Sequence, residues 1–275
     1  MLQENLIKGR ATCSQRNVVT NCDAQLGQAK KGTAAICALA ATLLLCLFCN
    51  TLGAQSVPSA RSYLDPLKVQ LKEEWPRNKT VNLVFHGHSV PAGYFKTPLV
   101  NSLEAYPHLV LEKVKEMYPT AVVNTIVTAI GGEHSQKGAK RFKTEVLTHA
   151  PDVLFIDYAL NDRNIGLERA KAAWELMIKE ALAQDVKVIL LTPTPDLKED
   201  ILLEDAPLER HSGQVRELAA RFGVGLVDSY GLFREIAKAE DLKRYMAQGN
   251  HVNGKGHAVV SEAIAHFFIG KLNRE

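Results

Sequence analysis

The fold is decided by a short segment in which an apolar run passes directly into a polar turn: residues 81–89 read VNLVFHGHS. Residues 81–85 are largely apolar and too few for a helix, which is typical of a strand buried in a parallel sheet. His86, Gly87 and His88 follow without a break, so that Ser89 lies where the strand leaves the sheet. The segment therefore predicts the first strand of an α/β sheet with a serine at its carboxyl end.

The same pattern continues along the rest of the chain. Four further short runs rich in β-branched residues follow, at residues 121–127, 153–158, 188–192 and 225–227. Longer amphipathic segments alternate with them, at residues 102–117, 135–147, 166–184, 207–222 and 257–272. This alternation predicts a three-layer α/β/α fold, with a flavodoxin-like, doubly wound parallel sheet of five strands.

The composition is that of an ordinary globular protein. The 275 residues are 46% hydrophobic and 23% charged, which excludes disorder, collagen-like repetition and coiled coil for the chain as a whole. All five cysteines lie in the first 49 residues, so the remainder can form neither a disulfide framework nor a cysteine metal site. The net charge of +3 also comes from the first 54 residues, and the neutral remainder predicts no nucleic-acid partner.

The N-terminal segment predicts export. Lys30 and Lys31 precede an almost wholly apolar run at residues 34–49, and small residues follow up to Ala54. This order is typical of a secretory signal, and we expect cleavage near Ala54 and a periplasmic or extracellular location. Because the run is slightly long for a signal, the alternative is an uncleaved membrane anchor with the domain outside the cytoplasm. We therefore expect residues 1–54 to be a signal peptide or anchor. Residues 55–78 are expected to be a proline-containing linker that ends in a short helix near 67–74, and residues 79–275 are expected to form the domain.

In doubly wound sheets, ligands bind beyond the carboxyl ends of the strands. The polar residues at these points are Ser89 after the first strand, Gly132 after the second and Asn161 after the third. His251 lies in the loop that precedes the last helix. Taken singly, each has an ordinary structural explanation as a helix cap, a turn or a loop residue.

Taken together and in this order, the four segments resemble the SGNH hydrolases, also called the GDSL esterase/lipase superfamily. The resemblance covers about residues 80–273. The matching blocks are Gly87-His88-Ser89, Gly132, Ala159-Leu160-Asn161-Asp162, and the stretch from His251 to His257 with Asn253, Gly254 and Gly256.

The resemblance implies an SGNH hydrolase fold and a serine esterase. Ser89 would be the nucleophile and His251 its general base, with no cofactor and no metal. The backbone N–H groups of Ser89 and Gly132 and the side-chain amide of Asn161 would form the oxyanion hole. For an exported member without an apolar lid segment, the resemblance implies short acyl groups on a small carbohydrate or polysaccharide as substrate. Tyr94 and Asp196 are candidate substrate contacts.

Three positions depart from the family pattern: His88 replaces an aspartate, Ala159 a glycine, and Gln248 the aspartate that orients the catalytic histidine. Three explanations are open for Gln248. The histidine could be oriented by a backbone carbonyl in a Ser–His dyad, or another carboxylate such as Asp241 could reach it. Alternatively, the chain could be a catalytically dead carbohydrate-binding protein.

A metal-dependent hydrolase is the rival interpretation. His86 and His88 project to one side of an extended chain, and His134, His251 and His257 are expected near the same sheet edge. Three imidazoles, such as those of His86, His88 and His251, could hold zinc with an open position for water.

Overall fold

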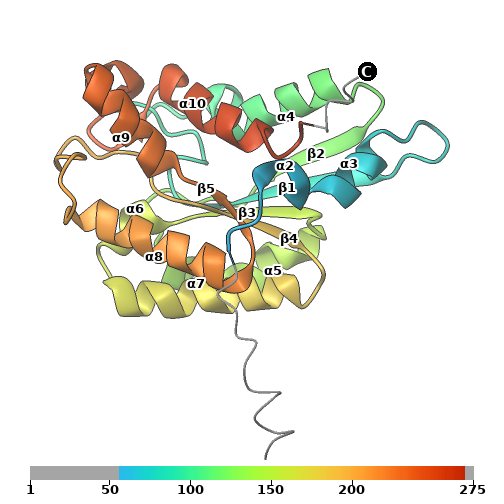
Figure 1. Cartoon of the computed structure of the whole chain (residues 1–275), viewed down its shortest axis with the longest axis horizontal. Coiled ribbons are helices and arrows are strands. Elements are labelled where there is room, and N and C mark those ends of the chain that lie inside the picture. Colours follow the sequence, from blue (N-terminus) through green and yellow to red (C-terminus); the bar gives the residue numbers. More distant parts are fainter. Residues whose placement is uncertain (1–55, 270–275) are drawn as a thin grey trace, which may run out of the picture. The chain divides into compact units, whose positions relative to one another are not determined.

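The computed structural model describes residues 56–269 (Figure 1). The predicted leader at residues 1–54 lies outside the described residues, as do residues 270–272 of the predicted last helix. Within the described part of the chain, no helix is both long enough and apolar enough to cross a bilayer.

The core of the domain is a five-stranded parallel sheet, as the sequence predicts. Its strands are β1 (Thr80–Gly87), β2 (Val122–Val127), β3 (Val153–Asp157), β4 (Lys187–Leu191) and β5 (Gly225–Val227). They lie in the order β2-β1-β3-β4-β5, and all neighbouring pairs are parallel. The chain therefore winds outward in both directions from β1 and β3, and the crevice at this switch point is where a ligand is expected.

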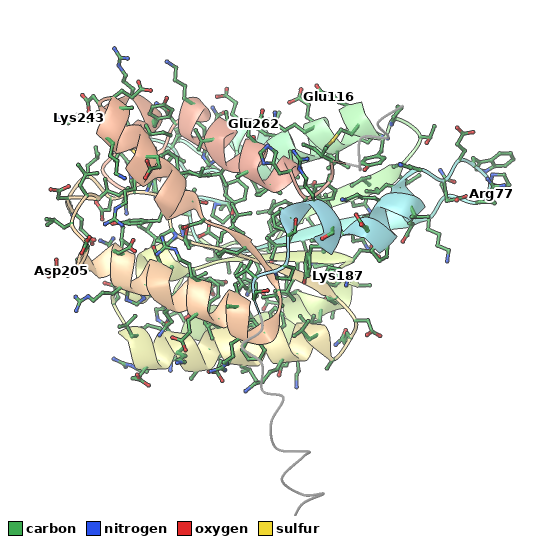
Figure 2. The ribbon with its side chains drawn as sticks, in the orientation of Figure 1. Arg77, Glu116, Lys187, Asp205, Lys243 and Glu262 are labelled. Carbon is green, nitrogen blue, oxygen red and sulfur yellow. The ribbon has the colours of Figure 1, made fainter. Side chains whose placement is uncertain are left out.

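Helices cover both faces of the sheet (Figure 1). One face carries α4 (Tyr106–Met117), α9 (Ser229–Ala239) and α10 (Gly254–Ala265), and the other carries α5 (Ser135–Glu145), α7 (Leu167–Leu182) and α8 (Pro207–Phe222). Because side chains alternate along a strand, Leu83 and Phe85 enter the first core and Val84 enters the second. Charged side chains such as Glu116 and Lys243 are exposed on the outer surfaces of the helices (Figure 2).

Two helical regions differ from the expectation. The segment expected to be a linker contains α3 (Asp65–Leu71), which overlaps the short helix expected near 67–74, and also α2 (Ala60–Tyr63), which was not expected. Its leucines Leu64, Leu67 and Leu71 are buried in the core. The Tyr63 hydroxyl also contacts the backbone of Val188, donating to its carbonyl at 2.9 Å and accepting from its N–H at 3.2 Å. Helices α2 and α3 therefore pack on the core as part of the domain. Helix α9 has no counterpart in the sequence prediction.

The remaining elements are short. They are α6 (Ala159–Asp162), the 3₁₀ helices η1 (Ser102–Glu104), η2 (Leu147–His149) and η3 (Leu242–Tyr245), and the paired strands β6 (Met246–Gln248) and β7 (His251–Val252). The hairpin of β6 and β7 carries His251 back toward the sheet edge, and α10 begins directly after it.

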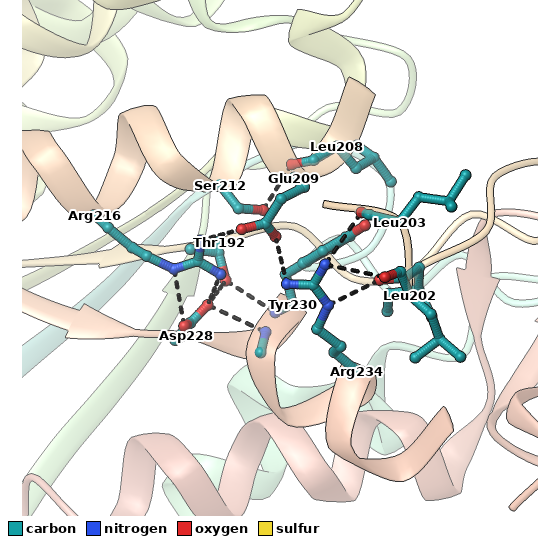
Figure 3. Close-up of polar contacts among 12 residues, drawn as sticks. Thr192, Leu202, Leu203, Leu208, Glu209, Ser212, Arg216, Asp228, Tyr230 and Arg234 are labelled. Atoms are coloured by element: carbon teal, nitrogen blue, oxygen red, sulfur yellow. Dashed lines mark hydrogen bonds and ion pairs between the residues drawn. The ribbon is translucent and has the colours of Figure 1, made fainter. Parts of the chain in front are cut away.

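A polar cluster fixes the ends of β4 and β5 and the helices that follow them (Figure 3). Asp228 accepts hydrogen bonds from Thr192 at 2.8 Å and from the N–H of Gly231 at 3.2 Å, so it caps α9. Arg216 of α8 donates to both of its carboxylate oxygens, at 2.9 and 3.0 Å. Arg234 of α9 binds the carbonyls of the loop at residues 201–203. The cluster thus joins α8, α9 and this loop to the sheet.

Candidate active site

Ser89 lies two residues beyond β1, on a turn packed tightly against β3. Gly87 permits this packing, because a Cβ atom there would lie 2.4 Å from the carbonyl oxygen of Asp157 and 2.8 Å from Pro91. His88 is fully buried and its Nδ1 accepts the N–H of Val90 at 3.2 Å. The turn therefore holds Ser89 at the carboxyl end of the sheet.

The structure brings Ser89 and His251 into contact although they are 162 residues apart in the chain. The Oγ atom of Ser89 lies 2.9 Å from Nε2 of His251. Each residue is only 6% exposed. A buried hydroxyl hydrogen-bonded to an imidazole is the arrangement from which a serine can be activated as a nucleophile.

The other imidazole nitrogen, Nδ1 of His251, has two neutral neighbours. The carbonyl oxygen of Phe95 lies 2.9 Å from it, and the amide nitrogen Nε2 of Gln248 lies 2.8 Å from it. Asp241, a carboxylate considered from the sequence, is exposed and instead accepts the N–H of Lys243 at the start of η3. Asp241 therefore does not orient His251. The Phe95 carbonyl is placed to do so, which agrees with the first of the three explanations, a histidine oriented by a backbone carbonyl.

These two neighbours favour different tautomers of His251. The Phe95 carbonyl can only accept, so it favours a proton on Nδ1 and leaves Nε2 free to take the proton of Ser89. The Gln248 amide nitrogen donates, so it favours a bare Nδ1. Its orientation is fixed by Thr97, whose N–H donates to Oε1 of Gln248 at 3.0 Å. Base catalysis by His251 requires the tautomer that the carbonyl selects.

Burial lowers the pKa of His251 below its ordinary value of 6.5, and the hydrogen bond to the Phe95 carbonyl opposes this shift. The nearby His88 imidazole lowers the pKa further. The imidazole is therefore neutral and able to accept a proton at neutral pH.

Three N–H donors line the pocket in front of this pair. The pocket has a volume of about 360 Å³, and Ser89, Gly132, Asn161 and His251 all contribute to its wall. Among the described residues, no protein acceptor takes the backbone N–H of Ser89 or of Gly132. Asn161 uses one side-chain N–H for the carbonyl of Glu133 at 2.9 Å, which leaves the other for a ligand. Gly132 has φ of 74°, a conformation that favours glycine.

The rest of the lining is polar and was only partly anticipated. Tyr94 lines the pocket as the sequence predicts, and its ring packs over Gly131, whose Cβ atom would lie 3.0 Å from it. Thr97, Gln248 and Asn250 complete the wall. Sequence reasoning missed Thr97 and Asn250 because a polar residue in a loop carries no signal of its own.

Asp196 is not part of this pocket. It is 6% exposed, forms an ion pair with Arg163 at 2.7 Å and accepts the N–H of Lys198 at 3.0 Å. Its carboxylate therefore stabilises the loop after β4, as a turn aspartate does. The contacts of Asp196 are thus structural, where the sequence suggested a contact with the substrate.

The histidines of the metal interpretation do not converge. His86 contacts the hydroxyls of Thr128 at 3.0 Å and Tyr158 at 3.1 Å. Nε2 of His88 faces Asp157 at 3.3 Å, whereas His251 faces Ser89. No group of three or more His, Cys, Asp or Glu side chains within residues 56–269 is arranged to hold a metal ion. The geometry therefore gives this interpretation no support.

A serine–histidine pair in one pocket with N–H groups that no acceptor within residues 56–269 takes, at the carboxyl edge of a parallel α/β sheet, is typical of the serine hydrolases. The comparison with family models is more specific. The GDSL-like lipase/acylhydrolase family model matches residues 85–259, so the chain belongs to this family. It is an enzyme that hydrolyses ester bonds, and the resemblance seen in the sequence is confirmed.

Solved structures of esterases share the fold. The acetylxylan esterase Axe2 from Geobacillus stearothermophilus is similar with a TM-score of 0.61 and 19% identity, over 71% of this chain and 97% of that one. A two-domain esterase (CEX) active on acetylated mannans has the same TM-score and identity, over 78% of this chain and 54% of that one. The same esterase co-crystallised with mannopentaose is 20% identical, with a TM-score of 0.61, over 78% of this chain and 55% of that one. No curated protein matches the sequence significantly.

Proposed function

We propose that this enzyme is a serine esterase that removes short acyl groups, above all acetyl, from carbohydrate, with Ser89 as nucleophile and His251 as general base. The observation that carries the proposal is the 2.9 Å contact between Oγ of Ser89 and Nε2 of His251, beside N–H groups that no acceptor in the described part of the chain takes.

The proposed reaction begins with attack of the Ser89 oxygen on the ester carbonyl. Nε2 of His251 takes the hydroxyl proton and returns it to the departing alcohol, which leaves an acyl group on Ser89. A water molecule, deprotonated by the same nitrogen, then releases the acid and frees the serine. The Phe95 carbonyl, 2.9 Å from Nδ1, keeps the ring oriented and stabilises the transient imidazolium.

Negative charge develops on the carbonyl oxygen in both steps. The N–H groups of Ser89, Gly132 and Asn161 are the donors that can meet this charge, because all three residues line the same pocket. Loss of one such donor raises the barrier by roughly 3 kcal/mol in other enzymes.

The pocket supports a small acyl group on a polar alcohol. Its wall contains the polar side chains of Thr97, Asn161, Gln248 and Asn250, together with Tyr94, and no aliphatic side chain. A long acyl chain would find little apolar surface to bury there, whereas amides and hydroxyls can bond sugar hydroxyls. The structural neighbours that act on acetylated xylan and mannan agree with this substrate class.

The proposed activity lies outside the cytoplasm. The apolar run at residues 34–49, preceded by Lys30 and Lys31, is the support for this location. Fractionation of cells that produce the full chain tests it, since a cytoplasmic enzyme at the full chain mass would contradict export.

The experiment compares p-nitrophenyl esters of increasing acyl length and the acetate released from acetylated xylan and mannan. We expect the acetyl ester to give the highest kcat/KM, and Ser89→Ala to reduce kcat by roughly 10³-fold or more. The matched control is Ser62→Ala, which changes an exposed serine of α2 and should keep wild-type kinetics. Undiminished turnover by Ser89→Ala would overturn the mechanism, and a preference for long acyl chains would overturn the substrate.

A further inference from the structure

A buried polar cluster that the proposed chemistry does not use lies directly behind the loop of Gly132. It consists of Glu133, Arg141 of α5, Tyr158 after β3, and His86 and Thr128 at the ends of β1 and β2. The side chains of Glu133 and Arg141 are only 7% and 12% exposed. Burying polar groups is costly unless each is paired, and a fully paired network makes the surrounding structure rigid.

The carboxylate of Glu133 is the centre of this cluster. Nε of Arg141 lies 3.0 and 3.2 Å from its two oxygens, and the hydroxyl of Tyr158 donates to Oε2 at 2.7 Å. Burial and this hydrogen bond raise the pKa of Tyr158 far above its ordinary value, so the hydroxyl stays a neutral donor. Arg141 also donates to the carbonyl of Thr128 at 2.6 Å, which ties the cluster to the end of β2.

The same residue connects two of the proposed oxyanion donors. Glu133 follows Gly132 directly, and its carbonyl accepts the side-chain N–H of Asn161 at 2.9 Å. Tyr158 lies three residues before Asn161, and its carbonyl accepts the backbone N–H of Asn161 at 3.1 Å. The side chain of Glu133 thus contacts Tyr158, and the backbone carbonyl of Glu133 contacts Asn161. Glu133 therefore binds both ends of the segment 158–161.

We infer that Glu133 is a positioning residue for the oxyanion hole: its buried carboxylate, held by Arg141 and Tyr158, fixes the Gly132 N–H and the Asn161 amide toward one point in the pocket. This inference rests on the proposed function. Donors that are fixed before the reaction stabilise developing charge without reorganisation, and small displacements weaken them. The role therefore concerns the transition state and not the binding of substrate.

The test is Glu133→Gln, which keeps the size of the side chain and removes its charge. We expect kcat per active site to fall roughly tenfold or more while KM changes less than about twofold, because only transition-state binding is lost. Affinity for a boronic acid that forms a tetrahedral adduct should fall by the same factor as kcat/KM. The matched control is Glu145→Gln, which removes the exposed carboxylate that contacts the same arginine at 3.4 Å and should keep wild-type kinetics.

An unchanged kcat in Glu133→Gln, or a rise in KM alone, would overturn the inference. If Glu133→Gln does not fold, Tyr158→Phe tests the inference instead. This variant removes one hydrogen bond to Glu133 and leaves the ion pair between Glu133 and Arg141 in place. A fall in kcat and in boronate affinity at constant KM supports the role, and wild-type values contradict it. Failure of the proposed function is distinguishable, because the wild type itself would then lack turnover that depends on Ser89.

Discussion

At the scale of single residues, the proposed chemistry depends on two uncharged groups beside Nδ1 of His251. The Phe95 carbonyl selects the tautomer that a general base needs, and the Gln248 amide nitrogen at 2.8 Å selects the other. A carboxylate at this nitrogen would favour the active tautomer and stabilise the imidazolium as well. In the proposed mechanism, the side chain at position 248 therefore influences the rate.

Gln248→Glu is the variant that tests this reasoning. The glutamate can keep an acceptor for the Thr97 N–H and place its second oxygen near Nδ1 of His251. We expect kcat to rise by roughly tenfold, which is less than the effect of the aspartate in a serine protease because the carbonyl already orients the ring. Nearby negative charge raises the pKa of His251, so the acid limb of kcat/KM should move to higher pH.

The burial of His251 determines where the acid limb of the wild-type enzyme lies. Its pKa lies below 6.5 in the wild type, so the wild-type acid limb should lie below pH 6.5. The control is Gln136→Glu, which adds the same charge at an exposed position of α5 and should leave the limb in place. Superimposable pH profiles for Gln248→Glu and the wild type would contradict the account of Nδ1.

The sequence predicted those residues of the site that lie in recognisable motifs. Ser89, Gly132, Asn161 and His251 each follow a strand or precede a helix in a recognisable block, and the structure gathers all four around one pocket. The contact of Phe95 could not be predicted, because a main-chain carbonyl leaves no mark on residue identity. Glu133 was missed because its role depends on partners in α5 and after β3 that only the folded chain brings together.

At the scale of elements, the sequence predicted the strands and the longer helices better than the segments between them. The five strands were found because short runs rich in apolar and β-branched residues can be recognised without knowledge of their partners. Helix α3 overlaps the short helix expected near residues 67–74, whereas α2 was missed because its four residues are too few to show a periodic pattern. The leucines of this region are buried only once they pack on the sheet. Helix α9 begins directly after β5, has Gly231 in its first turn, and is anchored by the cap from Asp228.

Asp228→Ala is the variant that tests this anchor. It removes the cap of α9 and one of the partners of Arg216, so we expect the free energy of unfolding to fall by about 1–2 kcal/mol. Urea denaturation followed by circular dichroism measures the change. The control is Glu217→Ala, which removes an exposed ion pair with Lys171 and should cost less than about 0.5 kcal/mol. Equal effects of the two substitutions would show that the cluster in Figure 3 does not hold α9 in place.

At the scale of the whole molecule, buried histidines make the stability of the fold depend on pH. Burial lowers the pKa of His86 and of His257 to about 3 and that of His211 to about 4, against 6.5 for an ordinary histidine. These side chains are neutral in the folded state, whereas the unfolded chain binds protons once the pH falls below 6.5. Their contribution is complete above pH 6.5 and is lost progressively as the pH falls toward 3.

We therefore expect the urea midpoint to fall steadily between pH 6.5 and about pH 4.5, before most carboxylates begin to titrate. Midpoints measured at closely spaced pH values check this. A midpoint that stays constant over this interval would mean that the three histidines are not held neutral by the fold.

The most direct test of the central claim is the mass of the intact enzyme, quenched with acid during turnover of an activated acetyl ester. The account predicts that the wild type gains one acetyl group, that peptide mapping places it on Ser89, and that Ser89→Ala gains none. An acetyl group on another residue, or turnover by Ser89→Ala at the wild-type rate, would contradict the claim that Ser89 is the nucleophile.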